Sequence, residues 1–410
     1  MISIRKFIFA VIALLIIGFS GYFVLRESAL APTFIEHLFD TPKDESPQMD
    51  DIPLVEIILL DDKSVDNGAD DGDSNDDNDS DNNSDNDNDG ENEFEDDEPE
   101  DAQDTLVSLT ISAAGDTTLG GIVGGTQMFM REFERQDRDH SFFLSNVRHI
   151  FEEDDLTILN LEGTLTDASG YKEKTYVLRG PPHYAKILSS SGVDVVTLAN
   201  NHSKDFFERG YRDTIKSLED EGIAYFGNEF NTILEINGIR VGLFGFSLWG
   251  GGRDNERRIA NAIKDLREKD AQLIIAYYHW GIERNYSPEK YQRTLGHFSI
   301  DNGADLVLGS HPHVIQGIEE YNGKSIVYSM GNFSFGANTN PADHDTFIFQ
   351  QSFVFENGEL QDTHDINIIP ASISSEKGRN NFQPTVAEGE EAERILQRIQ
   401  TYSDKLNGNG

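Results

Sequence analysis

Apolar runs with the length of buried strands recur along the chain from residue 106 onward. They are rich in Val, Ile and Leu and cover residues 106–113, 156–161, 193–198, 241–246, 273–278 and 306–308. Continuous apolar runs of this kind are typical of strands that are covered on both faces of a sheet. Between them lie segments with apolar residues at helical spacing, at residues 211–221, 255–269 and 288–300. The alternation predicts an α/β fold, in which helical connections join parallel strands.

Three Asn-Gly pairs add hairpins to this pattern. They are Asn237-Gly238, Asn322-Gly323 and Asn357-Gly358, each between apolar or alternating runs. Asn-Gly is a preferred sequence for the two-residue hairpin turn, because both residues readily adopt positive φ. The sheets are therefore expected to be mixed, with parallel and antiparallel neighbours.

The first 27 residues have the pattern of a membrane anchor. Residues 7–25 carry no charge and follow Arg5 and Lys6. As a helix they would extend roughly 28 Å, which is near the thickness of the bilayer core. Positive charge on the amino-terminal side predicts a single-pass protein of the cell membrane whose remaining chain is extracytoplasmic. A cleaved signal peptide is the alternative, because residues 29–31 resemble a cleavage site.

Acidic residues gather in a segment that we interpret as a linker, residues 28–104. The formal net charge of the chain is -41, and residues 61–104 contain 22 Asp and Glu against one Lys. A stretch of Asp, Asn, Ser and Gly with so few apolar residues cannot offset the entropy of ordering it. We therefore expect a disordered, self-repelling spacer, and its charge excludes nucleic acid as its partner.

The carboxy-terminal part, residues 373–410, is predicted to be a connector followed by a helix. Residues 390–406 place apolar side chains at helical spacing, namely Ala392, Ile395, Leu396, Ile399 and Tyr402. We expect this helix to dock on the domain, and a partner-binding helix is the alternative. The chain is thus divided into an anchor (1–27), a linker (28–104), a folded domain (105–372) and this last segment.

Candidate ligand side chains follow several of the apolar runs. They stand in Gly115-Asp116, Asn160-Leu161-Glu162, Asn200-Asn201-His202, His279 and Ser310-His311-Pro312-His313. Five such clusters in one domain are hard to obtain from structural needs alone, so they predict a shared polar site. Histidines at i and i+2 of an extended strand point to the same side, which suits His311 and His313 to metal binding. Carboxylate, amide and imidazole groups in a chain without Cys favour a divalent ion such as Mn, Fe or Zn.

Six ordered motifs resemble the family of the poly-γ-glutamate capsule biosynthesis protein CapA. They are AGDTTLG (114–120), NLEG (160–163), LANNH (198–202), HWGIE (279–283), GSHPHVIQG (309–317) and YSMGNF (328–333). The resemblance extends from about residue 106 to about residue 370. That family is similar to the calcineurin-like metallophosphatases, so the resemblance implies a four-layer αββα sandwich of two mixed sheets between helices.

The resemblance also implies roles for individual residues. The metal ligands would be Asp116, Glu162, Asn201, His279, His311 and His313, with Glu162 as the candidate bridge between ions. His202 would be the catalytic proton donor or would stabilise the transition state. Metallophosphatases usually carry a histidine where this chain has Thr118, so both one and two divalent ions stay open.

Four further polar residues are expected to contact the substrate. They are Lys174, Arg179, Glu283 and Asn332. The alternative is that the three charged side chains are solvated in loops and that Asn332 satisfies the backbone of its turn.

The function that these features predict is an anchored, extracytoplasmic, metal-dependent hydrolase or transferase. As the resemblance implies, it would act in the synthesis, export or processing of an anionic surface polymer such as poly-γ-glutamate, at an amide or a phosphoester bond. Its partners would be the membrane, the polymer and other capsule synthesis or export subunits. Two alternatives stay open: a non-catalytic subunit that tethers the polymer during export, and a metallophosphoesterase with another substrate. A protein without stoichiometric metal would favour the non-catalytic alternative.

Overall fold

The computed structural model describes residues 54–59, 105–362 and 365–408. The predicted membrane span at residues 7–25 and most of the predicted linker lie outside the described residues. Within the described part, no helix is both long and apolar enough to cross a membrane. One segment of the predicted linker is described as a strand, β1 (Leu54–Leu59), which pairs in parallel with β9 (Asn231–Ile236).

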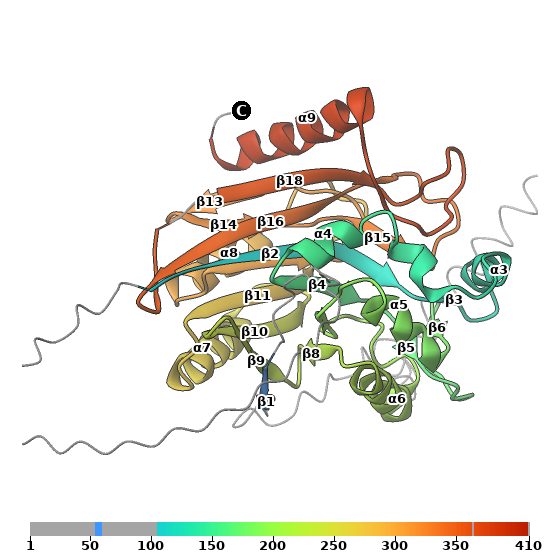
Figure 1. Ribbon diagram of the computed structural model, residues 1–410, viewed down its shortest axis with the longest axis horizontal. Helices are drawn as coiled ribbons and strands as arrows, with labels where there is room; N and C mark the ends of the chain where they lie inside the picture. The colour runs from blue at the N-terminus through green and yellow to red at the C-terminus, as the bar shows by residue number, and fades with distance from the viewer. Residues whose placement is uncertain (1–53, 60–104, 363–364, 409–410) are drawn as a thin grey trace, which may run out of the picture. The chain divides into compact units, whose positions relative to one another are not determined.

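A nine-stranded sheet contains four neighbouring parallel strands and an antiparallel side (Figure 1). The parallel strands are β2 (Leu106–Thr118), β4 (Leu156–Leu161), β7 (Val195–Thr197) and β8 (Ala224–Phe226). On the other side of β2 lie β16 (Asp345–Glu356), β18 (Asp365–Ser372) and β19 (Thr385–Val386). Each of them pairs antiparallel with the strand before it in this order. Two short strands lie off this path: β15 (Asn332–Phe335) pairs with β2, and β17 (Glu359–Leu360) pairs with β16.

A seven-stranded sheet has the order β1-β9-β10-β11-β12-β14-β13. Its parallel strands are β10 (Ile239–Leu248), β11 (Leu273–Trp280), β12 (Leu306–Ser310) and β14 (Lys324–Val327). Strand β13 (Ile318–Tyr321) pairs antiparallel with β14. Every residue of β11 and β12 is buried, as their continuous apolar runs predict. A small third sheet is formed by β3 (Gly121–Ile122), β6 (Leu178–Gly180) and β5 (Thr164–Leu165).

The two large sheets share one hydrophobic core. Ile111 and Ile158 of the nine-stranded sheet belong to the same buried cluster as Leu243, Ile275 and Leu308 of the seven-stranded sheet. A second cluster lies between the nine-stranded sheet and its helices, which are α3 (Met128–Arg135), α4 (Arg148–Glu153), α5 (Ala185–Ser189) and α6 (Phe207–Asp220). A third lies between the seven-stranded sheet and α7 (Arg253–Glu268) and α8 (Lys290–Asp301). The prediction of a mixed α/β domain with parallel strands is confirmed.

The hairpin predictions are also confirmed. The three Asn-Gly pairs join β9 to β10, β13 to β14, and β16 to β17. Their φ angles are positive at both residues, 51° and 78°, 50° and 72°, and 53° and 80° in chain order. These values are typical of the turn that matches the twist of the flanking strands.

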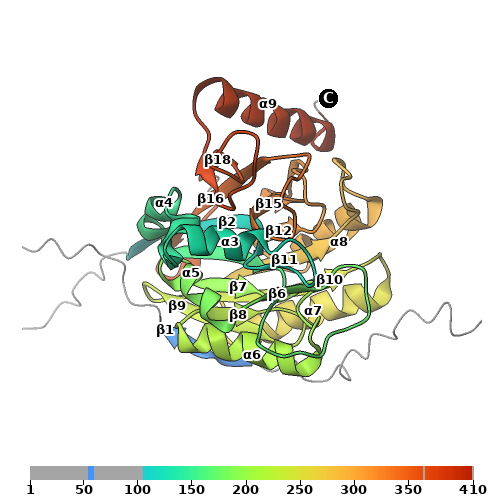
Figure 2. The same cartoon turned by 90° about the vertical axis from the view of Figure 1, so that its right-hand side faces the viewer.

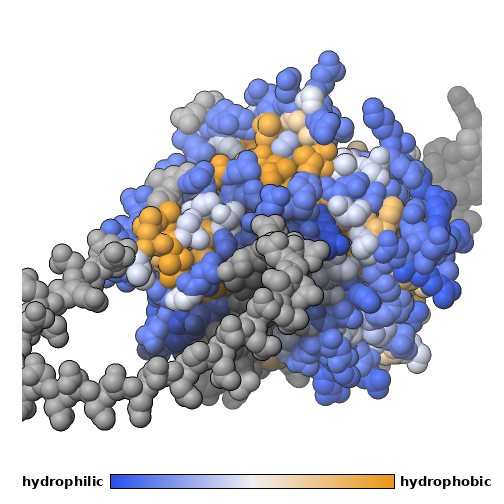
Figure 3. Space-filling model, in the orientation of Figure 1, coloured by the Kyte–Doolittle hydropathy of each residue, from blue (hydrophilic) through white to orange (hydrophobic). Residues whose placement is uncertain are grey.

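The last helix, α9 (Gly389–Leu406), lies alongside β18 in both views of the domain (Figures 1 and 2). It contributes Ile395 and Ile399 to the core that the two sheets share. Its Ser403 hydroxyl accepts a hydrogen bond of 2.9 Å from the Ile318 amide of β13. The face drawn in Figure 3 is mainly hydrophilic, with hydrophobic groups near α9 and toward the left-hand edge. Leu396 of α9 and Ile366 of β18 are each 39% exposed.

Candidate functional site

Polar side chains from both large sheets meet where their parallel strands end. Asp116 lies near the end of β2, and Glu162 directly follows β4. His279 lies in β11, and His311 and His313 follow β12. The carboxyl ends of parallel strands are a usual place for a functional site in α/β proteins.

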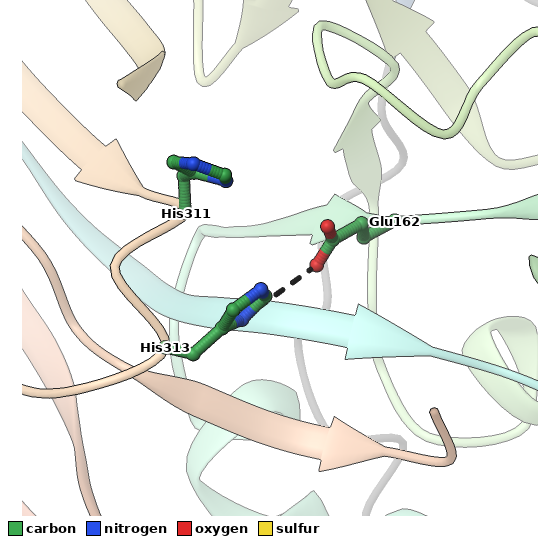
Figure 4. A group of neighbouring side chains, drawn as sticks. All are labelled: Glu162, His311 and His313. Atoms are coloured by element: carbon green, nitrogen blue, oxygen red, sulfur yellow. Dashed lines mark ion pairs between the residues drawn. The ribbon is translucent and has the colours of Figure 1, made fainter. Parts of the chain in front are cut away.

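Glu162, His311 and His313 form a compact group (Figure 4). One ligand atom from each lies within 4.8 Å of the others, and His313 Nδ1 is 3.9 Å from Glu162 Oε2. Among the described residues, Glu162 Oε2 and His311 Nδ1 are buried and have no hydrogen-bond partner. Because unpaired buried polar atoms are costly, both atoms need a partner. One carboxylate and two imidazoles suit a divalent transition ion, so this group could bind a metal.

The protonation of this group is consistent with a cation site. Burial raises the pKa of Glu162 to about 8, and the nearby Asp116 carboxylate adds to that rise. Burial lowers the pKa of His313, but the carboxylates of Glu162 and Asp116 outweigh burial and raise it to about 10. Protons thus occupy a buried site with two carboxylates, and a metal ion can displace them. Burial lowers the pKa of His311 to about 4, so that its imidazole is neutral, as a ligand must be.

Asp116 lies beside this group and is fully buried. It accepts a hydrogen bond of 2.8 Å from Asn160 Nδ2, and its Oδ2 is 3.0 Å from His313 Nδ1. Burial raises the pKa of Asp116, but the charge and hydrogen bond of His313 outweigh burial and leave it below its usual value. Asp116 is therefore ionised next to the group.

His279 and Asn201 border the group on another side. His279 Nε2 is 2.9 Å from Asn201 Oδ1 and 3.7 Å from Glu162 Oε1. Burial lowers the pKa of His279 well below its usual value, so this imidazole is neutral. The structure thus brings all six predicted metal ligands together, although the compact group contains only three of them.

The backbone of the two histidines differs from the prediction. An extended backbone was expected at both, but φ is +95° at His311 and +56° at His313. The prediction of an extended backbone at these two positions is therefore wrong. Positive φ is unfavourable for residues other than glycine and persists where surrounding contacts fix it, a common feature of functional sites. The His311 amide is fixed in this way, 3.2 Å from Asp116 Oδ2.

His202 lies at the edge of the site, at the end of a buried chain of charges. Its Nδ1 is 2.8 Å from Asp205 Oδ2, and its Nε2 is 3.9 Å from Glu162 Oε1. Asp205 Oδ1 is in turn 2.5 Å from Lys174 Nζ. Burial lowers the pKa of His202, although the hydrogen bond to Asp205 opposes this shift. His202 is therefore a neutral imidazole held in place by Asp205.

A cavity of about 490 Å³ opens from the group and carries two of the four predicted substrate contacts. Glu162, His202 and His313 line it, together with Glu283 and Asn332. Asn332 Oδ1 is 3.0 Å from His313 Nδ1, so Asn332 also holds an imidazole.

The other two predicted contacts have partners in the protein. Lys174 binds Asp205 and donates a hydrogen bond of 2.9 Å to the Asn201 carbonyl. Arg179 donates to the Ala168 carbonyl at 3.2 Å, and its guanidinium lies 5.5 Å from the centre of the Phe206 ring.

Two residues beside the site, Asn160 and Trp249, were not predicted from the sequence to have a role there. Asn160 Nδ2 lies within 3.2 Å of Asp116, His279 and Ser310, so one amide links three site residues. Trp249 is 53% exposed, and its ring centre is 4.8 Å from that of His311. Asn160 stands in a motif that was noticed for its Glu162, whereas nothing near Trp249 in the sequence marks it.

A match to a solved structure is distant. The crystal structure of a hypothetical protein from Thermus thermophilus superposes with a TM-score of 0.40 at 16% sequence identity. It covers 64% of this chain and 98% of that chain.

Two curated relatives are named for capsule synthesis. The PGA biosynthesis protein CapA of Bacillus subtilis (strain 168) is 28% identical over 248 residues, and the match covers 55% of this chain and 63% of that protein. The capsule biosynthesis protein CapA of Bacillus anthracis is 29% identical over 258 residues, and the match covers 55% of this chain and 60% of that protein. The chain thus spans less than two thirds of the length of each relative.

The family match covers the strands that carry the site. Residues 110–337, more than half of the chain, match the family model of the bacterial capsule synthesis protein PGA_cap. The matched range includes Asp116, Glu162, His279, His311 and His313. The chain therefore belongs to the PGA_cap family of bacterial capsule synthesis proteins.

Proposed function

We propose that this chain is a metal-dependent hydrolase or transferase that acts on poly-γ-glutamate during capsule synthesis, export or processing. The observation that carries the proposal is the buried group of Glu162, His311 and His313. Two of its potential metal-ligand atoms have no hydrogen-bond partner, and Glu162 and His313 line a cavity. The names of the two relatives support the choice of polymer. The bond that is cut or transferred would be an amide of the polymer or a phosphoester.

The layers support a metallophosphatase-like fold as part of the same proposal. The two sheets share a core, and helices cover the outer face of each. We interpret this arrangement as the four-layer αββα sandwich that the sequence resemblance implies.

The residues that would hold the metal are the six predicted ligands. They are Asp116, Glu162, Asn201, His279, His311 and His313, for one or two ions of Mn, Fe or Zn. When bound, such an ion supplies Lewis acidity and lowers the pKa of a coordinated water. His313 and Glu162 would lose the protons that they hold in the absence of the ion.

His202 would move protons at its Nε2 atom. Its Nδ1 donates to Asp205, so the lone pair of the neutral ring lies on Nε2, which faces Glu162 and the cavity. A neutral imidazole in this position accepts a proton and later returns it to the leaving group. Asp205 fixes this tautomer and stabilises the charged ring, while Lys174 holds Asp205.

The cellular setting of the proposal rests on the amino-terminal sequence. Residues 7–25 would anchor the chain in the cell membrane as a single span, with the domain outside the cell. Because β1 pairs with β9, the acidic residues 61–104 connect two strands of the domain, and residues 28–53 would act as the spacer to the membrane. Other capsule synthesis or export subunits would be partners at the same membrane.

Metal content and turnover of the full chain test the proposal. The double variant His311→Ala with His313→Ala should lose most of the Mn, Fe or Zn that the wild type binds, because each histidine supplies a ligand atom. Elemental analysis measures the metal, and chromatography of poly-γ-glutamate measures chain shortening or transfer. Equal metal content in both proteins would overturn the metal site. If the chain binds stoichiometric metal but causes no metal-dependent change of the polymer, the proposed substrate is wrong and the proposed metal site stands.

A further inference from the structure

The wall of the cavity includes residues from two loops that α9 holds together. Tyr286 comes from the loop between β11 and α8, and Asp343 from the segment before β16. Asp343 and all of α9 lie beyond residue 337, where the family match ends. The part of the chain outside the matched range therefore helps to shape the cavity.

Arg398 of α9 contacts both wall residues. Its Nη1 donates to Asp343 Oδ1 at 2.9 Å, and its Nη2 also binds the Asp343 carboxylate. Its guanidinium lies 5.0 Å from the centre of the Tyr286 ring, within the range of a cation–π interaction. The Arg398 side chain is only 19% exposed, and its Nε donates a hydrogen bond of 3.3 Å to the Tyr402 hydroxyl.

The charge that Arg398 covers matters for an anionic ligand. Acidic residues line the cavity at Glu162, Glu283 and Asp343, whereas Arg284 is the only Lys or Arg among the described lining residues. Without Arg398, the Asp343 carboxylate would keep only neutral partners, the Asp345 amide at 3.2 Å and the Tyr286 hydroxyl, so its negative charge would face the cavity. Like charges across an interface disfavour binding. Arg398 neutralises the charge of Asp343 by forming an ion pair with it, although Arg398 does not itself line the cavity.

We propose that Arg398 is a positioning and specificity-determining residue, which holds Tyr286 and Asp343 in the cavity wall and neutralises Asp343 so that an anionic chain can enter. The identity of the anionic ligand rests on the proposed function, whereas the role of Arg398 in holding Tyr286 and Asp343 is independent of it.

Arg394 provides a matched control on the same helix, one turn earlier. Its guanidinium binds Asp345 with two hydrogen bonds of 2.6 Å, and Arg398 shares this partner at 2.5 Å. In the described part of the chain, the ion pairs of Arg394 go to Asp345 and Glu391 and not to the wall, so Arg394→Gln removes an α9 ion pair and leaves the wall. Ile395 and Ile399 keep α9 in the core in every variant.

Hydrogen exchange measured by mass spectrometry tests the holding of the wall in the full chain. Arg398→Gln should speed exchange of the amides in residues 281–289 and 336–344, because both segments lose their common contact. Arg394→Gln should leave residues 281–289 unchanged. Unchanged exchange in Arg398→Gln, or an equal increase in both variants, would overturn the positioning role.

Binding of a fluorescent γ-linked glutamate oligomer tests the charge. Arg398→Gln should weaken binding about tenfold, as expected for an uncovered like charge, and adding Asp343→Asn should recover most of the loss. Arg394→Gln should bind like the wild type, and all variants should keep the wild-type metal content. Failure of Asp343→Asn to recover binding would overturn the charge role. A wild type that does not bind the oligomer would instead overturn the proposed polymer and this charge role, while the exchange data still decide whether Arg398 holds the wall.

Discussion

Replacing Asp205 by Asn removes a buried charge while the shape of the side chain is kept. The two carboxylate oxygens have different partners. Oδ2 accepts from His202 Nδ1 at 2.8 Å and from the Leu178 amide at 2.7 Å, and Oδ1 is 2.5 Å from Lys174 Nζ. An asparagine has one acceptor oxygen and one NH₂ donor, so it cannot satisfy both sets. The better orientation keeps the oxygen toward His202 and Leu178 and points the NH₂ group at Lys174.

The stability loss follows from what Lys174 retains. Removing one partner of a buried ion pair costs about 3–5 kcal/mol when the other charge stays buried. Lys174 is 28% exposed and keeps its hydrogen bond to the Asn201 carbonyl, so we expect a smaller loss of about 2 kcal/mol. Turnover should fall by roughly 10², because the charged His202 ring loses the carboxylate that stabilises it.

Urea unfolding of the full chain measures this loss, and Lys174→Met is the matched variant. Lys174→Met removes the same ion pair by deleting the other partner. The double variant with Asp205→Asn should therefore lose about 1 kcal/mol less free energy of unfolding than the sum of the losses in the two single variants. Elemental analysis should find unchanged metal in all three, because neither residue is a proposed ligand. Strictly additive losses of stability would refute the coupling between Lys174 and Asp205.

Three further predictions concern acid stability, catalysis and topology. Burial raises the pKa of Asp345, but the two α9 arginines outweigh burial and lower it below 3.8. Its stabilisation is therefore complete above pH 3.8 and is lost as the pH falls through the lowered pKa, so the stability advantage of the wild type over Asp345→Asn in urea should be largest at pH 7 and should shrink steadily below pH 3.8. His202→Ala should keep its metal and lose roughly 10² in turnover, whereas Asp116→Ala should lose both, and comparable metal loss in the two would contradict the proton-transfer role. Protease added to protoplasts should cut within residues 61–104, and protection until the membrane is permeabilised would contradict the extracytoplasmic location.

The elements that depend on local patterning could be predicted from the sequence. The apolar run at residues 156–161 coincides with β4, and each Asn-Gly pair forms the expected turn. Both signals act over a few residues, through burial and through the tolerance of positive φ. Strand β1 is also an apolar run, LVEIIL, but it was assigned to the linker because it lies beside the acidic residues 61–104.

The candidate site was only partly predictable from the sequence. Its side chains could be found because they follow apolar runs, but the conformation at His311 and His313 could not. Positive φ at a histidine opposes the intrinsic preference of the residue, and tertiary contacts such as that of the His311 amide with Asp116 maintain it. The metal-ligand and catalytic roles stay predictions until metal and turnover are measured.

The geometry of the metal group depends on the packing of the two sheets against each other, because the nine-stranded sheet supplies Asp116 and the seven-stranded sheet supplies His279. A buried hydrogen bond of 2.9 Å from the Tyr277 hydroxyl to the Ala114 carbonyl joins β11 to β2. Both residues lie two positions before a site residue, so this bond fixes the position of β11 relative to β2 close to the site. His279 Nδ1 consequently lies 3.8 Å from Asp116 Oδ1, and Asn160 bridges them. A core change that shifts one sheet past the other would separate these groups before it unfolded either sheet, since close-packed interiors transmit strain.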